Sequence, residues 1–391
     1  MPTSLEPPAP PARPRLLSRQ FVLLLASTSM FGFSWSFYLI LPKFYATALD
    51  MDAAAIGRAV SVQGLTAVLA TPFVGWLVDR YERKRWLVVG NLILALTGSL
   101  YVLVDHEGPL LYAAQVCWGV GMVMGFNAAG TMTADIAPSD RMAQALGFFG
   151  AANLGMNAVS PTLGELLADT QGWKPVFVVS ATAGLLASLF STRLQEPHRH
   201  RPHAQESRVP IFGASLLRVY GTVFLMTAGF TALFTLHQPY ALGRGVTEVR
   251  GFFIGFAIVA LSVRLGGGRL IDRFGVLRSS LVALCLYAIV PPALGLLGPG
   301  RLFVIGSMMG LAHGIAYPAV TALGIERADA SSRGMVVSIV HGAFNGGHAF
   351  FAYALGSAAA AWGYGPTFWT AGGITAVGAL VLWAPRRKPL L

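Results

Sequence analysis

Between two long apolar runs the chain reads Gly75-Trp76-Leu77-Val78-Asp79-Arg80-Tyr81-Glu82-Arg83-Lys84-Arg85, a tight turn rich in basic residues. A related turn follows later, at Gly268-Arg269-Leu270-Ile271-Asp272-Arg273-Phe274-Gly275-Val276-Leu277-Arg278. The two glycines are 268 − 75 = 193 positions apart and the two aspartates 272 − 79 = 193, close to half of the 391 residues. A turn that recurs half a chain later predicts a molecule built from two copies of one unit.

The composition is typical of an integral membrane protein. Hydrophobic residues make up 54% of the chain and charged residues only 12%, whereas soluble domains carry roughly a quarter of charged residues. The net charge of +11 could suggest a nucleic-acid partner. The basic residues, however, lie in short turns and form no continuous basic face with interleaved aromatics, so we expect no nucleic acid. The two cysteines, Cys117 and Cys285, lie in apolar runs and indicate packing, without a disulfide or metal pattern.

Apolar runs recur along the whole chain. A spanning helix needs about twenty mostly apolar residues. Such runs lie at 20–45, 54–78, 86–104, 110–134, 142–168, 175–192, 215–241, 251–271, 279–297, 301–325, 334–361 and 366–384. We therefore predict an all-α polytopic membrane protein with twelve transmembrane helices.

Domain boundaries follow from the same runs. We expect an N-terminal six-helix bundle at 20–192 and a C-terminal one at 215–385, joined by a cytoplasmic linker at 193–214. The Pro- and Ala-rich segment 1–19 predicts a disordered cytoplasmic tail, and 386–391 a short C-terminal one. Histidines in the linker alternate with arginines and prolines, which favours a solvated segment over a metal site.

The positive residues predict the orientation, because cytoplasmic loops carry an excess of Lys and Arg. With both termini cytoplasmic, that side receives Arg13, Arg15, Arg19, Arg80, Arg83, Lys84, Arg85, Arg141, Arg193, Arg199, Arg201, Arg208, Arg218, Arg273, Arg278, Arg327, Arg333, Arg386, Arg387 and Lys388. The opposite side receives Lys43, Lys174, Arg244, Arg250 and Arg301. We expect a multi-pass protein of the plasma (inner) membrane.

A second pair of motifs supports the repeat. Gly150, Asn153 and Gly155 match Gly342, Asn345 and Gly347, with an offset of 345 − 153 = 192. Two halves of six spans each, joined on one side of the membrane, point the same way through it. The halves are therefore predicted to be parallel repeats, with a substrate site at their interface near the midplane.

Twelve spans in two halves, with Gly75-x-x-x-Asp79-Arg80-x-x-Arg83-Lys84 after the second, resemble the major facilitator superfamily of secondary transporters. The resemblance implies alternating access by rocking of the halves, with this turn as a latch that keeps the cytoplasmic side closed. A glycine allows close helix packing, and Asp79 can accept hydrogen bonds. Glu82 replaces the usual glycine, and Arg278 comes two positions late. The implied latch residues are Gly75, Asp79, Arg80, Arg83, Gly268, Asp272, Arg273 and Arg278.

The fifth span resembles the Gly-Pro-x-x-Gly-Gly signature of exporters in that family. The residues concerned are Gly155, Ser160, Pro161 and Gly164, followed by Glu165 where the signature has glycine. Proline and small residues permit a bend and close packing, and the match favours export. In the fourth span, proton-coupled exporters of the family carry an arginine where this chain has Gln115. That replacement argues against the family's usual proton coupling through this helix.

Polar residues inside spanning segments are costly and are therefore functional candidates. The candidates for proton coupling are His313, Glu165 and His237, since histidine changes charge near neutral pH. Each has an alternative: a histidine can be a neutral hydrogen-bonding partner, and Glu165 can extend to the membrane interface. Arg264 lies deep in the eighth span and is expected to face a partner or the cavity, and Asp135 is expected to pair with Arg141.

The resemblance implies that spans one, four, seven and ten line a central cavity. The candidates are Trp35, Tyr38, Asn127, Thr131, Gln238, Tyr240 and Tyr317, together with Asn345 of span eleven. An aromatic cavity with few charges suits an amphipathic organic molecule, although about half of the aromatics are expected to serve packing. Met309 and His313 lie one turn apart and could suit Cu(I), but one such pair is weak support for a metal.

These features together predict a secondary transporter that exports a small amphipathic compound, a drug or secondary metabolite, by proton antiport. The alternatives are an importer of a small solute, including copper, and a transporter-like sensor or lipid flippase. We expect no enzyme, because no carboxylate pair, nucleophile triad or phosphate-binding glycine loop occurs in a suitable setting. The expected partners are the substrate, protons and membrane lipid; we expect a monomer without cofactor or bound metal.

Overall fold

The computed structural model describes residues 16–138, 141–196, 211–266, 273–296, 300–329 and 332–384, without the side chains of Asp79 and Ala143. Gly268 and Asp272 of the second basic turn lie outside these residues, as do the two tails and most of the linker. Of the predicted latch, the structure therefore describes the first copy except for the Asp79 side chain, and only Arg273 and Arg278 of the second.

The first half of the chain forms six helical segments. They are α1 (Arg19–Ser36) continued by the 3₁₀ turn η1 (Phe37–Ile40) and α2 (Leu41–Ala48), then α3 (Ala53–Arg80), α4 (Arg83–Tyr101), α5 (Pro109–Ile136), α6 (Met142–Gln171) and α7 (Trp173–Thr192). Asp52 begins α3, because its side chain accepts a hydrogen bond from the amide of Ala55 at 2.7 Å.

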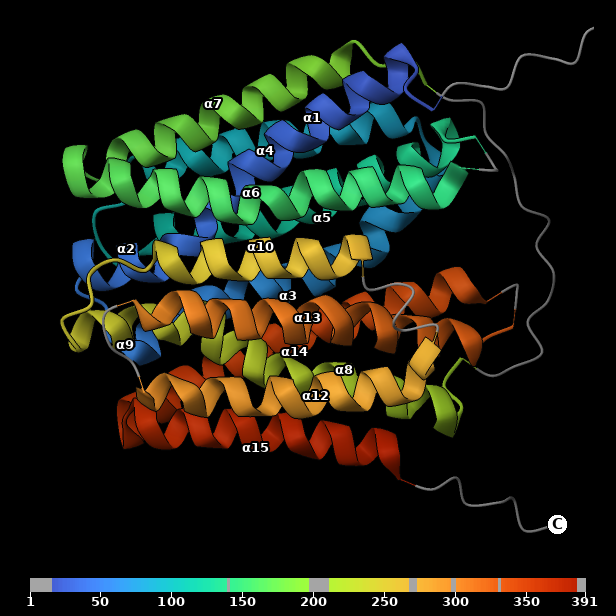
Figure 1. Cartoon of the computed structure of the whole chain (residues 1–391). Helices are drawn as coiled ribbons and strands as arrows, with labels where there is room; N and C mark the ends of the chain where they lie inside the picture. Colours follow the sequence, from blue (N-terminus) through green and yellow to red (C-terminus); the bar gives the residue numbers. More distant parts are fainter. Residues whose placement is uncertain are drawn as a thin grey trace, which may run out of the picture.

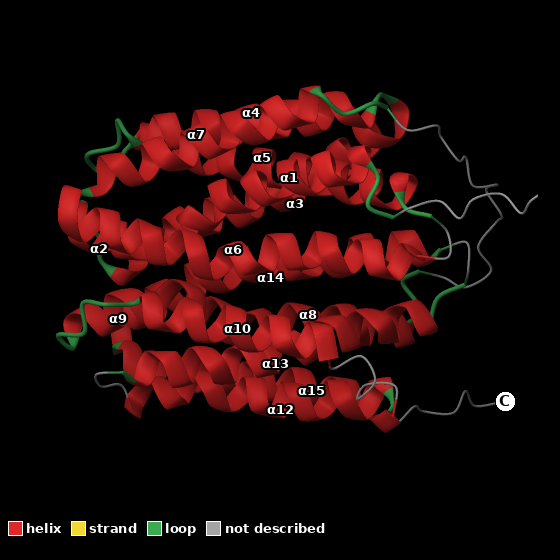
Figure 2. Ribbon diagram, turned by 45° about the horizontal axis from the view of Figure 1, so that its top comes forward, coloured by secondary structure: helices red, strands yellow, loops and turns green. Residues whose placement is uncertain are grey.

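The second half repeats this order. It contains α8 (Ala214–Thr231) continued by the π-helical turn η3 (Ala232–Leu236) and α9 (His237–Gly243), then α10 (Arg250–Gly266), α12 (Val276–Ala293) with η4 (Leu294–Leu296), α13 (Arg301–Glu326), α14 (Arg333–Trp362) and α15 (Tyr364–Trp383). Nothing but helices, loops and turns occurs in the described ranges (Figure 2). The predicted all-α fold of two six-helix repeats is confirmed.

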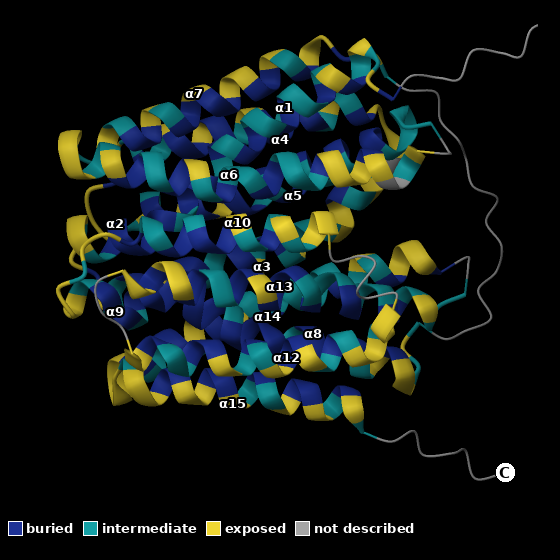
Figure 3. Cartoon of the chain, viewed as in Figure 1, coloured by how far each residue is buried: buried dark blue, intermediate teal, exposed yellow. Residues whose placement is uncertain are grey.

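The helices run nearly parallel or antiparallel to one another in two stacked groups (Figure 1). We call the end of the bundle at which α1 begins and α15 ends the terminal end, and the opposite end, which carries α2 and α9, the far end. Eight helical segments of the described chain are long and apolar enough to cross a membrane. Large apolar side chains such as Trp362, Trp369 and Trp383 are exposed on the outside, while the interior is buried (Figure 3). The molecule is an integral, multi-pass membrane protein.

Two helix pairs join the halves, α3 with α14 and α6 with α10. Toward the far end, α3 and α14 touch through small residues: a Cβ atom at Gly64 would lie 2.9 Å from that of Ala349, and one at Gly356 would lie 2.7 Å from the carbonyl of Ala53. Gly57 likewise has no room for a side chain against Ala352. Small residues let these backbones approach closely.

Toward the terminal end the same two helices separate. Gly75 follows Gly57 by 75 − 57 = 18 residues, or about five turns, so both lie on one face of α3. A Cβ atom at Gly75 would nevertheless meet nothing within 4 Å, and the same holds for Gly342 on α14. The expected close packing at Gly75 is therefore wrong for this conformation, in which the halves are closed at the far end.

Candidate functional site

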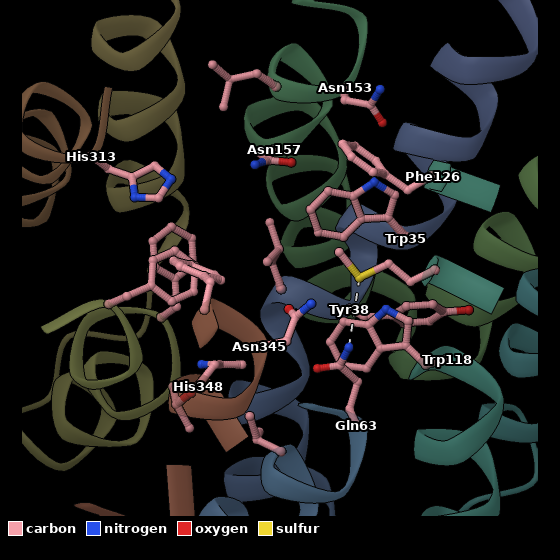
Figure 4. Close-up of a pocket in the computed structure, with 18 of the residues that line it drawn as sticks. Trp35, Tyr38, Gln63, Trp118, Phe126, Asn153, Asn157, His313, Asn345 and His348 are labelled. Carbon is pink, nitrogen blue, oxygen red and sulfur yellow. Dashed lines mark hydrogen bonds between the residues drawn. The ribbon is translucent and has the colours of Figure 1, made fainter. Parts of the chain in front are cut away.

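A cavity of about 260 Å³ lies between the two halves. Aromatic and amide side chains form most of its wall, with Trp35, Tyr38 and Trp118 on the side of the first half and His313 and His348 on the side of the second (Figure 4). The amides of Gln63, Asn153, Asn157 and Asn345 face the same space. Such a mixture of apolar surface and a few polar groups is typical of a site for a small organic molecule.

Breaks in the first helix of each half shape the wall. The 3₁₀ turn η1 interrupts α1 at Phe37–Ile40, and the π-helical turn η3 interrupts α8 at Ala232–Leu236, the corresponding place in the repeat. Tyr38 and Leu39 of η1 and Phe234 and Thr235 of η3 line the cavity. Broken helices at equivalent positions of two repeats are typical of binding sites in membrane proteins, and π-helical turns often mark functional sites.

Hydrogen bonds fix the histidines of the second half. The Nδ1 of His313 lies 3.1 Å from the hydroxyl of Tyr287, and that of His348 lies 2.9 Å from the hydroxyl of Thr231. The ring of His313 packs against Phe230 at 5.5 Å between centroids. Arg264 of α10 also lines the cavity and is exposed.

The structure places three of the eight predicted cavity residues on the wall: Trp35, Tyr38 and Asn345. Asn127 and Thr131 are not part of the wall, and the other three make different contacts. Gln238 donates a hydrogen bond to the carbonyl of Leu39 at 2.8 Å, Tyr240 packs against Phe368, and the hydroxyl of Tyr317 lies 2.8 Å from His341.

Several wall residues were missed by the sequence prediction: Gln63, Trp118, Phe126, Asn153, Asn157, Phe230, Phe344 and His348. A signal existed for two of them, because Asn153 belongs to the repeated Gly-x-x-Asn motif and His348 shares a helix face with Asn345. Gln63 and Asn157 are buried amides in spanning helices, and the cost of burying them was the only available indication.

A charged cluster joins the halves at the far end, and Glu165 is its centre. The side chain of Glu165 is fully buried. One carboxylate oxygen accepts hydrogen bonds from Nζ of Lys43 and from the amide of Val249, both at 2.7 Å, and the other accepts one from the amide of Arg250 at 2.7 Å. Lys43 also contacts Asp169 at 3.2 Å. We call Lys43, Glu165, Val249 and Arg250 the far-end clasp.

The sequence explains why Glu165 occupies this position. Helix α10 starts at Arg250, and the preceding Val249 has no side-chain oxygen that could accept from the first amides. Glu165 of α6 supplies that acceptor from the other half, and its negative charge suits the N-terminal end of a helix. The amide of Lys43 in turn donates to Gln238 of the second half at 3.1 Å. The clasp therefore connects α2 and α6 to α9 and α10.

The three candidates for proton coupling occupy different environments. His313 lies on the cavity wall. His237 does not line the cavity; it is fully buried near the far end, with its ring 4.3 Å from that of Phe252. His348, which was not among the candidates, lines the cavity instead. Glu165 does not extend to an interface but is buried in the clasp.

In the first basic turn, Arg83 is buried and forms a salt bridge with Asp135 of α5. Glu196 accepts hydrogen bonds from the amides of Arg83 and Lys84 at 2.8 and 2.9 Å, which fixes the start of α4. These contacts join α4 to α5 and to the start of the linker. Asp135 thus pairs with Arg83, and the expected pairing with Arg141, which is exposed, was wrong.

The remaining latch residues described by the structure are at the surface. Arg80 is exposed and lies over the ring of Trp76, 5.4 Å from its centroid. Arg273 and Arg278 are exposed as well.

The exporter-like motif of α6 packs against the first helix. Ser160 donates a hydrogen bond to the carbonyl of Phe33 at 2.8 Å, and a Cβ atom at Gly164 would lie 2.7 Å from Ile40. Pro161 lies inside α6, which continues without interruption, and Gly155 has open space around it. The motif thus allows close contact of α6 with α1 and η1, the segment that carries Trp35 and Tyr38.

Gln115 stands where related exporters carry an arginine, and it lies in a neutral network. The side chain is fully buried and donates to the hydroxyl of Tyr45 at 2.6 Å. The Tyr45 hydroxyl lies 2.7 Å from that of Tyr101. Gln115 is not part of the cavity wall.

Two six-helix repeats, a cavity between them and a closure at one end define a class of polytopic membrane proteins with a central site. The family model of the Major Facilitator Superfamily matches residues 22–301 and 256–391. The chain belongs to that superfamily.

Individual relatives share modest identity. Multidrug resistance protein 2 of Bacillus subtilis (strain 168) is 24% identical over 263 residues, which cover 63% of this chain and 64% of that protein, so the match spans less than two thirds of the relative. Multidrug resistance protein MdtG of Dickeya zeae (strain Ech586) is 27% identical over 351 residues, 85% of this chain and 84% of that protein. The solved structure of a D-xylose-proton symporter superposes with a TM-score of 0.76 at 15% identity, over 94% of this chain and 98% of the other.

Proposed function

We propose that the protein is a secondary active transporter that works by alternating access and exports a small amphipathic organic compound in exchange for protons. The observation that carries the proposal is the cavity between the halves, closed at one end by the far-end clasp. A site that is closed toward one side and lies at the interface of two repeats is the geometry that alternating access requires. Two relatives named for multidrug resistance support export.

The orientation belongs to the same proposal. We place both termini in the cytoplasm, in the inner membrane, because Lys and Arg are concentrated in the turns at the terminal end. The far end then faces outward. In this conformation the site is closed to the outside, and the helices α3 and α14 separate toward the cytoplasm.

Glu165 is the group that we propose for proton coupling. Its ionised form accepts hydrogen bonds from Lys43 of its own half and from two amides at the start of α10, and the amide contacts exist only while the halves meet at the far end. The charged groups around it are Lys43 of α2, Arg250 and the neighbouring Glu248 of the second half, and Asp169 of its own helix. Opening the far end removes the two amides of α10 and leaves Lys43 as the partner of the carboxylate, and we propose that Glu165 takes up the coupled proton in that conformation.

The test is transport by the purified full chain in proteoliposomes of known orientation, with a pH-sensitive dye inside and a panel of amphipathic compounds outside. Inside-out vesicles with an acidic lumen should accumulate a compound while protons leave the lumen. Accumulation driven by the opposite gradient would identify an importer. A failure of every compound to move protons, with tight binding retained, would favour a sensor and contradict the proposal.

A further inference from the structure

One cation of the cavity wall has no counter-charge. Arg264 lies fourteen residues after the start of α10, about 21 Å along the helix axis from the far end. Throughout the described ranges, none of the observed salt bridges or hydrogen bonds involves its guanidinium, whereas Lys43 is paired with Glu165 and Arg83 with Asp135. An arginine at this depth is costly unless it faces water or a partner. Arg264 does face the cavity.

The rest of the wall carries no negative charge. No Asp or Glu occurs among the cavity-lining residues of the described chain; besides Arg264, the polar groups there are amides, histidines, a tyrosine, a threonine and two indoles. A cationic ligand would meet a repulsive guanidinium and no carboxylate in this space. An anion would find a planar, permanently charged donor whose geometry matches a carboxylate.

The shape of the wall specifies the rest of the ligand. Trp35, Trp118, Phe126, Phe230 and Phe344 provide apolar faces around the same cavity. A volume of about 260 Å³ lies at the lower end of the range for small-molecule sites. One cation balances one negative charge, so the wall suits a small monoanion with an apolar body.

We propose that the substrate is an amphipathic organic monoanion whose anionic group binds Arg264 and whose apolar body packs between the aromatic side chains of the cavity. The inference rests on the proposed transport function and names the substrate class of the same site. Arg264 thereby selects against organic cations of the same shape.

The experiment compares ligands that differ only in charge. Phenyl, naphthyl and biphenyl scaffolds are each used as the acetate (anion), the acetamide (neutral) and the methylammonium (cation). Equilibrium binding to the purified full chain is measured by titration calorimetry, and transport is measured in proteoliposomes. For at least one scaffold, the acetate should bind at least about tenfold more tightly than the acetamide, the gain expected from one charged hydrogen-bond pair. The ammonium form should bind most weakly.

Variants connect this preference to Arg264. Arg264→Gln should remove the preference for the acetate and change the affinity for the acetamide less than about twofold. Arg264→Lys should keep part of the preference, because an ammonium group supplies the positive charge but not the planar guanidinium that pairs with both carboxylate oxygens. Arg301→Gln is the control, because it removes the same charge from an exposed position outside the cavity. It should leave the preference intact.

The possible results separate the two proposals. The monoanion inference is overturned if the cationic or neutral forms are bound or transported in preference to the acetate, or if no acetate binds. Transport of the cationic or neutral forms would still support the transporter proposal. An acetate preference that survives in Arg264→Gln also overturns it. Acetate binding that depends on Arg264 without transport of any form supports the inference and contradicts the transport function.

Discussion

At the scale of single residues, one carboxylate lies at the centre of the contacts between the halves at the far end. Glu165 accepts three hydrogen bonds of 2.7 Å, one from Lys43 in its own half and two from α10 in the other. Breaking a buried ion pair by removing one charge costs up to about 3–5 kcal/mol, and here Lys43 would keep only the partly exposed Asp169 as its partner. That cost falls on the closed conformation and favours opening.

We predict that Glu165→Gln opens the far end. The measurement is labelling of Thr235→Cys, a cavity position with only 2% of its surface exposed, by a membrane-impermeant thiol reagent added on the far side. Cys117 and Cys285 are first replaced by serine. The labelling rate should rise at least about tenfold, as a shift of a few kcal/mol requires.

Asp169→Asn is the matched control, because Asp169 contacts the same lysine but its side chain is 44% exposed. An exposed ion pair contributes only about 0–1 kcal/mol, so labelling should change little. Equal labelling in both variants and in the parent would show that the clasp does not hold the far end closed.

Sequence reasoning identified individual cavity residues only in part, and the helix breaks explain why. Trp35 and Tyr38, before and within η1, were placed correctly on the wall, but Gln238 and Tyr240 follow the π-helical turn η3. An inserted π turn rotates every later side chain relative to a regular helix, so the residues that face the cavity beyond it could not be derived from the span alone. Asp135 was paired with its neighbour in sequence, although Arg83 approaches it from another helix.

At the scale of helices, α3 carries two glycines with opposite surroundings. Gly57 lies against Ala352 at the closed end, and Gly75, on the same face, has open space. In an alternating-access cycle, α3 and α14 come into contact at Gly75 when their contact at Gly57 is lost. The two positions therefore report on two different conformations.

We predict opposite effects for alanine at these positions. Gly57→Ala should disfavour the far-closed conformation by about 1–3 kcal/mol, since the new methyl group overpacks the contact with α14. Far-side labelling of Thr235→Cys should then rise. Gly75→Ala should leave that labelling unchanged and slow transport by hindering closure at the terminal end. A faster far-side labelling rate in Gly75→Ala, or an unchanged rate in Gly57→Ala, would be inconsistent with the separation of α3 and α14 toward the terminal end.

Helix positions could be predicted well because the membrane requires long apolar runs whatever their neighbours. The expected run 54–78 corresponds to α3 (Ala53–Arg80), and 301–325 to α13 (Arg301–Glu326). The partners of the helix ends could not be predicted. Glu165 caps the N-terminus of α10, although it precedes Arg250 by 250 − 165 = 85 residues in the chain. Only the packing of α6 against α10 creates that contact.

At the scale of the whole molecule, the two halves are joined by pairs that are equivalent in the repeat, α3 with α14 and α10 with α6. The N-termini of the equivalent helices α3 and α10 are capped differently: Asp52 caps α3 within its own half, while Glu165 caps α10 across the interface. The clasp therefore breaks the symmetry of the repeat, and the proposed function assigns the control of closure at the far end to this one carboxylate.

The central claim is that the two ends open in alternation under the control of Glu165. The most direct test is a distance measurement by pulsed electron resonance between spin labels at two pairs of exposed positions, Ala48 with Thr247 at the far end and Tyr81 with Met335 at the terminal end. In Glu165→Gln the far-end distance should lengthen and the terminal-end distance should shorten, each relative to the parent. An unchanged far-end distance, or a lengthening at both ends, would contradict the account.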